Sequence, residues 1–115
     1  MQRRFLVVLA MMALTCGALV AQEPPDVLLE IGLPSGETPQ LRIRNGETGT
    51  VEIPNVGKFG FVPTLKGSVV SVELFDLNKT PHRQVDRIEA VVGGDTVQSN
   101  TKPQFRIRVI RVVGR

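Results

Sequence analysis

The feature that most constrains the fold is an alternation of apolar and polar residues with a period of two. Val27, Leu29 and Ile31 alternate with polar or small residues, and Phe105 and Ile107 alternate with arginines. Glycine, proline and asparagine separate such segments at short intervals, and no stretch of helical length has the 3.6-residue spacing of an amphipathic helix. The sequence therefore predicts an all-β chain.

Seven or eight short strands are expected, which favours a small antiparallel β-sandwich or a partly open barrel. Asn45-Gly46 and Lys66-Gly67 are typical of tight hairpin turns. The immunoglobulin pattern of paired cysteines around a tryptophan is missing, so only the architecture is predicted. The expected strands cover residues 27–33, 41–44, 50–53, 59–65, 68–77, 84–92, 96–99 and 105–113.

The segment 68–77 is expected to form the longest strand, and its alternation slips near the end. Phe75 and Leu77 fall on the opposite parity from the apolar residues before them. A β-bulge near Leu74-Phe75 would return both side chains to the core. The chain has no Trp or Tyr, and we expect all four phenylalanines after the leader to be core residues. Recognition by aromatic stacking is therefore disfavoured.

The first 21 residues have the pattern of a secretory signal peptide, which would form a short helix. An apolar run follows Arg3 and Arg4 and ends at the small residue Ala21. We expect cleavage after Ala21 and export from a bacterial cell, to the periplasm or the medium. A lipid anchor on Cys16 fits less well, because the residues before it depart from the lipoprotein pattern.

After the leader, residues 22–26 are expected to be a flexible lead-in and residues 27–115 a single domain. Cys16 is the only cysteine and would leave with the leader. The exported chain would therefore form no disulfide, thiolate metal site or cysteine nucleophile, and its stability would depend on the apolar core.

Charge is nearly balanced overall but unevenly distributed. The chain has 14 Lys and Arg against 11 Asp and Glu, and two of the bases, Arg3 and Arg4, belong to the leader. Acidic residues prevail before Lys66 and basic residues after it. Such asymmetry suits a protein that meets another protein, although solvated domains also show it by chance.

One short sequence occurs twice, as PQLRIR at residues 39–44 and PQFRIR at residues 103–108. The match does not extend further, so it does not indicate a duplicated domain. Both copies predict strands with a proline at the start and arginines on the solvent face. Two ordinary half-buried strands, with the second at a sheet edge, are the alternative interpretation. The candidate interaction surface consists of Arg42, Arg44, Arg106, Arg108 and Arg111.

No grouping of residues indicates catalysis or metal binding. His82 is the only histidine and lies in a polar segment, 78–83, that predicts an exposed loop. The serines and carboxylates that might act with it lack a nucleophile motif or a cleft. We therefore expect no enzyme, no catalytic residue, no cofactor and no metal. The groups considered are Ser68, Ser71, Ser99, Glu73, Asp76, Asp86 and Glu89.

The function expected first is a non-catalytic extracytoplasmic β-domain that acts by protein–protein interaction in a cell-envelope or secreted assembly. Pairing at a sheet edge would be the natural mode. The second hypothesis is a polyanion-binding module that uses the arginine-faced strands on a cell-wall polymer or an anionic membrane surface. A third is a secreted enzyme inhibitor that presents the loop at 78–83. Nucleic acid and a small-molecule substrate are not expected.

Overall fold

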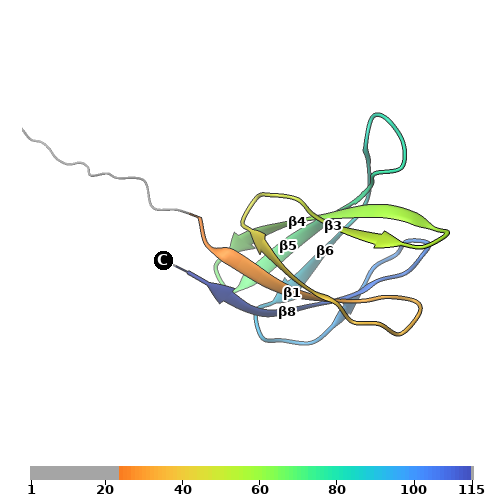
Figure 1. The fold of residues 1–115 in the computed structure, drawn as a ribbon. Helices are drawn as coiled ribbons and strands as arrows, with labels where there is room; N and C mark the ends of the chain where they lie inside the picture. Colours follow the sequence, from red (N-terminus) through yellow and green to blue (C-terminus); the bar gives the residue numbers. More distant parts are fainter. Residues whose placement is uncertain (1–23, 115) are drawn as a thin grey trace, which may run out of the picture.

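The computed structural model describes residues 24–114, and the regular structure in that range consists of strands alone (Figure 1). The predicted all-β class and strand number are confirmed, while the predicted signal peptide lies outside the described residues. Within residues 24–114 no helix has the length and apolar content needed to cross a membrane. The strands are β1 (Asp26–Gly32), β2 (Gln40–Arg44), β3 (Gly49–Ile53), β4 (Gly57–Lys66), β5 (Val69–Asp76), β6 (Arg83–Val91), β7 (Val97–Gln98) and β8 (Arg106–Val113).

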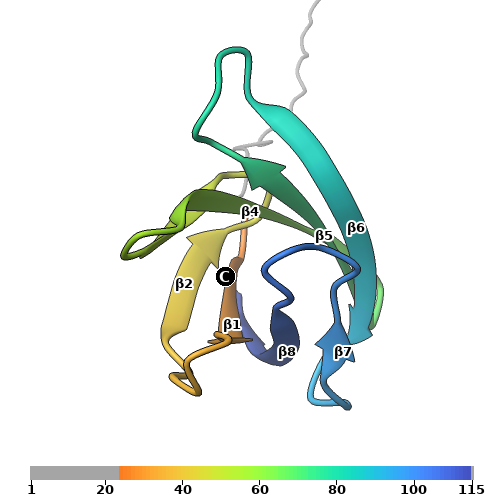
Figure 2. The same ribbon diagram turned by 90° about the vertical axis from the view of Figure 1, so that its right-hand side faces the viewer.

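The strands form two antiparallel sheets of four that face each other (Figure 2). The first sheet has the order β2-β1-β8-β7, and the second has the order β3-β4-β5-β6. The chain crosses from one sheet to the other after β2 and again after β6. This arrangement is a β-sandwich, one of the two predicted architectures. β1 pairs with the last strand, β8, so the two ends of the described chain lie in one sheet.

The core lies between the sheets and is made by the alternating apolar residues of each strand. Leu29 and Ile107 of the first sheet and Phe61 of the second have no exposed surface. Phe105 joins the layers, because its ring centre lies 5.3 Å from that of Phe59 and 5.3 Å from that of Phe61. Both contacts are edge to face, the favourable geometry for aromatic pairs.

The predicted bulge is present, but it lies in a different strand from the one expected. The pairing of β5 with β6 skips Val85, so the extra residue belongs to β6. β5 keeps an unbroken alternation, and Phe75 pairs with Gly60 on the outer face of the second sheet. Phe75 and Leu77 are therefore half-buried on that outer face, and their predicted place in the core is wrong. The longest strand is β4, with 10 residues.

The two predicted hairpins have different outcomes. A two-residue turn joins β4 to β5, as expected, and Gly67 supplies its positive φ of 64°. The hairpin predicted at Asn45-Gly46 is wrong, because β2 and β3 belong to different sheets. This dipeptide is a corner instead: the Gly46 N–H donates to the Pro63 carbonyl at 2.8 Å, and the Asn45 side chain accepts from the Leu65 N–H at 2.7 Å.

Candidate functional site

The five arginines predicted as an interaction surface lie on one face of one sheet. β1 separates β2 from β8, so the two arginine-bearing strands are not hydrogen-bonded neighbours. Leu28 of β1 pairs with Arg42 on one side and with Arg111 on the other, which puts both arginines on the outer face. We call this surface the arginine face; it carries Arg42 and Arg44 from β2 and Arg106, Arg108 and Arg111 from β8.

A second bulge keeps the last of these arginines on the face. The pairing of β1 with β8 skips Ile110, so Arg111 points to the same side as Arg108 although their spacing is odd. β8 pairs with β1 along its length and with β7 at Arg106 and Ile107. The interpretation of this segment as an edge strand is therefore wrong at its first two residues, whereas β2 does lie at an edge.

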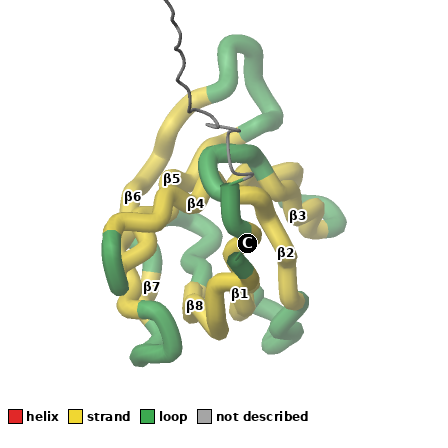
Figure 3. Tube along the Cα trace, turned by 90° about the vertical axis from the view of Figure 1, so that its left-hand side faces the viewer, coloured by secondary structure: helices red, strands yellow, loops and turns green. Residues whose placement is uncertain are grey.

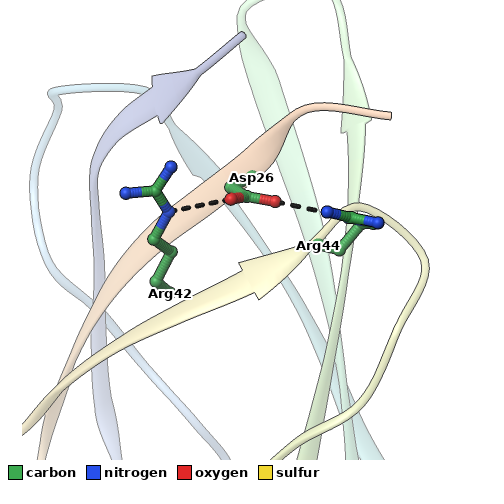
Figure 4. A network of polar contacts seen from close by, with 3 residues as sticks. All are labelled: Asp26, Arg42 and Arg44. Atoms are coloured by element: carbon green, nitrogen blue, oxygen red, sulfur yellow. Dashed lines mark hydrogen bonds and ion pairs between the residues drawn. The ribbon is translucent and has the colours of Figure 1, made fainter. Parts of the chain in front are cut away.

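Two carboxylates from β1 lie among the arginines. Asp26 accepts a hydrogen bond from Arg42 Nε at 2.8 Å, and its other oxygen lies 3.6 Å from Arg44 Nε (Figure 4). The Arg42 hydrogen bond lowers the pKa of Asp26, and the charges of both arginines lower it further. Glu30 accepts from Arg108 Nε at 3.2 Å. Exposed pairs of this kind contribute little to stability because solvent screens them, so they orient the arginines more than they stabilise the fold.

A polar groove of about 340 Å³ opens beside this network, between β1, β8 and β7. Arg106 lies over Gly32 and donates to the Leu33 carbonyl at 3.3 Å. A Cβ atom at Gly32 would come within 2.9 Å of Arg106 Nε, so the glycine leaves the room in which this guanidinium lies. The lining holds two arginines against one carboxylate, Glu30, and this excess of positive charge suits a carboxylate or another small anion. The groove is lined by Glu30, Gly32, Thr38, Thr96, Gln98, Arg106 and Arg108.

Arg111 differs from the paired members of the face. Its side chain is exposed, and it makes no ion pair or hydrogen bond with any residue in the range 24–114. Its guanidinium therefore offers all of its donors to a ligand or a partner. Arg42, Arg44 and Arg108 instead share theirs with Asp26 or Glu30.

Several of the serines and acids considered as catalytic groups have structural partners. Ser71 is buried and accepts a hydrogen bond from Arg87 Nε at 3.0 Å. Ser99 Oγ accepts from the Phe105 N–H at 2.8 Å, and Asp86 accepts from a main-chain N–H of the loop before β8 at 2.7 Å. Among residues 24–114, no three His, Cys, Asp or Glu side chains gather closely enough to hold a metal ion. The expectation that the chain is not an enzyme stays a prediction.

One feature was missed by the sequence reasoning, an apolar depression on the outer face of the second sheet. Its volume is about 380 Å³, and Phe75 and Leu77 supply much of its apolar lining. Sequence reasoning assigned both residues to the core and so left this face polar. His82, expected to be a solvated loop residue, is exposed and lies at the rim. The full lining is Thr48, Thr50, Val62, Phe75, Leu77 and His82.

The loop of residues 77–82 projects beyond the end of the sandwich, as the teal segment at the top of Figure 2 shows. A projecting loop is the shape that an inhibitor of the predicted kind requires, and that hypothesis stays a prediction.

Comparison of the chain with known proteins gave no match to a protein-family model, to a curated protein or to a solved structure.

Proposed function

We propose that the chain is a non-catalytic binding domain that acts outside the cytoplasm, by contact with an acidic protein partner in a cell-envelope or secreted assembly. The observation that carries this proposal is the arginine face. Five arginines from strands far apart in the sequence share one surface with only two carboxylates, Asp26 and Glu30. The extracytoplasmic part rests on the signal-peptide pattern of the first 21 residues.

The distribution of charge favours a protein over a uniform polyanion. Asp26 and Glu30 lie on the central strand of the face and would repel a ligand that is negative along its whole length. A folded partner can instead place acids against the arginines and a base or a polar group against the two carboxylates. Charge complementarity of this kind contributes more to the specificity for one partner than to the affinity.

The groove supplies a specific contact. Arg106 and Arg108 lie at its lining, and a guanidinium binds a carboxylate with two parallel hydrogen bonds. An Asp or Glu side chain of the partner would enter there, and Arg111 would take a second acidic group nearby. We therefore expect Arg106 and Arg108 to contribute most to the affinity.

The test is site-specific crosslinking in native envelopes. A photoreactive residue replaces Gln40, which pairs with Glu30 within the face, or Thr50, which is exposed on β3 at the edge of the second sheet away from β6. We expect a discrete protein adduct from position 40 and none from position 50. A crosslinking pattern that is the same at both positions would contradict the proposal.

Charge reversal provides the matched control. Arg106→Glu/Arg108→Glu should abolish the adduct from position 40. Lys58→Glu/Lys66→Glu makes the same change in net charge on β4 and should preserve the adduct. Equal losses in both double variants would mean that overall charge, and not the arginine face, governs binding.

Polyanion binding is the second candidate, and the excess of arginines over carboxylates on the face favours it. It predicts retention on heparin or on vesicles with anionic lipid, and a steep loss of retention as salt rises. The Arg106→Glu/Arg108→Glu variant should then elute early, whereas the Lys58→Glu/Lys66→Glu variant should not. Retention that is insensitive to salt would exclude this candidate.

A further inference from the structure

β6 is the longest unpaired edge of the sandwich. It ends the order β3-β4-β5-β6 and lies at the outside of the molecule in Figures 2 and 3. Its 9 residues exceed the 5 of β2, the 5 of β3 and the 2 of β7, the other edge strands. It contains no proline and no lysine, two residues that commonly prevent pairing at an edge, and its bulge at Val85 leaves residues 86–91 in regular pairing with β5.

The main chain of β6 offers hydrogen-bonding groups to a further strand. Val92 N–H donates to the Ser68 carbonyl at 2.9 Å, so the even-numbered residues after the bulge turn their main-chain groups toward β5. Arg87 and Glu89 consequently turn theirs toward the free edge. The Gly94 N–H donates to the Val91 carbonyl at 2.8 Å, which marks where that edge ends.

We propose that β6 pairs antiparallel with β6 of a second copy of this chain, with the two-fold axis at Ile88. Arg87 of each copy then lies opposite Glu89 of the other, and each such pair exchanges two main-chain hydrogen bonds. Both side chains are exposed on the outer face, Arg87 to 49% and Glu89 to 60%, and the 4.0 Å ion pair between them within one chain leaves most donors and acceptors of both groups open to the second copy. Oppositely charged residues directly across a strand pair stabilise it.

The charges select this register over its neighbours. If the second strand shifts by two residues in one direction, Arg87 lies opposite Arg87 of the other copy. If it shifts by two residues in the opposite direction, Glu89 lies opposite Glu89. Like charges in those positions are unfavourable. A shift by one residue would mismatch the main-chain groups and reverse the faces of the strand. The segment VDRIEAV at 85–91 is therefore self-complementary only about Ile88.

Exposed apolar residues follow the same symmetry. Val56, Val85 and Val91 are the exposed large apolar residues in the described part of the chain, with 52%, 39% and 52% of their surface exposed. Val85 precedes Ile88 by as many residues as Val91 follows it. In the proposed register Val85 of one copy lies opposite Val91 of the other, so the pairing covers two of these three side chains.

This interface lies on the second sheet and leaves the arginine face uncovered, so it does not depend on the proposed function. The test uses protein purified from cells that express the full chain. Sedimentation over a range of concentrations should show a reversible dimer. Arg87→Glu or Glu89→Arg alone should raise the dimer dissociation constant at least about tenfold, because each replaces two attractive pairs with two repulsive ones.

Two rescues distinguish this interface from a loss of folding. The double variant Arg87→Glu/Glu89→Arg should dimerise like the original chain. An equimolar mixture of the two single variants should form a mixed dimer of similar affinity, because every pair in it is again Glu with Arg. A monomer at all concentrations, unchanged dimerisation in the single variants, or failure of the mixture to associate would each overturn the proposal.

Discussion

At the scale of single residues, Asn78 connects the projecting loop to the sheet. Its side-chain oxygen accepts from the Lys58 N–H at 2.9 Å, and its amide group donates to Asp76 at 2.7 Å. The Asp76 carboxylate also accepts from the Asn78 N–H at 2.9 Å. Gly57 has a φ of 141° and lies directly against Asn78, where a Cβ atom would collide with the amide. The base of the loop is therefore fixed although its tip is exposed.

Replacing Asn78 tests this connection. Asn78→Ala removes the contacts to Lys58 and one of those to Asp76, and we expect it to lower the free energy of unfolding by about 1–2 kcal/mol. Urea denaturation measures the change. Thr80→Ala, in the exposed part of the same loop, should have almost no effect. Equal destabilisation by the two variants would show that Asn78 has no special role.

The two aspartates with lowered pKa predict how stability depends on pH. The hydrogen bond from Arg42 lowers the pKa of Asp26, and hydrogen bonds from the Asn78 main chain and side chain lower that of Asp76. Each carboxylate therefore stabilises the fold above the ordinary aspartate pKa of 3.8, and this contribution is lost as pH falls through the lowered value.

We expect the urea midpoint to be flat near neutral pH and to fall below about pH 4. Asp26→Asn should reduce this acid dependence, because an amide at that position does not titrate. The measurement is a series of urea denaturation curves from neutral to strongly acidic buffer, for the original chain and the variant. An identical acid dependence in both would show that Asp26 does not contribute.

At the scale of strands, the apolar alternation predicts which residues of one strand share a face, and this is why most core residues could be identified from the sequence. It does not predict which of two paired strands carries a bulge. Phe75 was misplaced because the extra residue is Val85 of β6. Asn45-Gly46 was misread because a hairpin and a corner need the same turn residues. The sheet that the next strand joins decides between them, and that depends on distant contacts.

The same limit applies to the arginine face. The sequence identified all five arginines and the solvent faces of their strands. It could not show that they share a surface, because this follows from the pairing of β1 with both β2 and β8. The alternation of this strand breaks at Val109-Ile110, but the break alone does not show that a bulge at Ile110 keeps Arg111 on the face.

The phenylalanine cluster gives a prediction at this scale. Phe105 is buried and contacts both Phe59 and Phe61 across the sandwich. Phe105→Ala should lower the free energy of unfolding by about 3–5 kcal/mol, because it removes a core ring and leaves a cavity. The free energy of unfolding of a single domain is about 5–15 kcal/mol in total, so this variant should be close to unfolding at room temperature.

Phe75→Ala is the matched control, since it removes the same ring from the half-buried outer face of β5. We expect Phe75→Ala to lower the free energy of unfolding clearly less than Phe105→Ala does. The shift of the urea midpoint measures the change in both variants. A loss at Phe75 equal to that at Phe105 would contradict the assignment of these residues to different faces.

At the scale of the whole molecule, the two proposed surfaces belong to different sheets and can act together. Antiparallel pairing of β6 with its copy relates the two chains by an axis perpendicular to the second sheet. The two first sheets therefore lie on the same side of the joined sheet, and both arginine faces point away from it in the same direction. The dimer would be a bivalent binder of an acidic surface.

Bivalence predicts that binding depends on the density of the acidic ligand. On a surface densely coated with a peptide that carries both Glu and Lys, the dimer can use both faces at once, and retention should exceed that on a sparse surface by at least about tenfold. Arg87→Glu should lose this dependence on density, because it binds through one face only. The double variant Arg87→Glu/Glu89→Arg should keep the dependence, since its charge and its pairing match those of the original chain. Because Arg87→Glu also lowers the net charge, the retention of each variant on the dense surface is divided by its own retention on the sparse surface. If the single and double variants respond alike to density, the two surfaces do not cooperate, whatever their separate affinities.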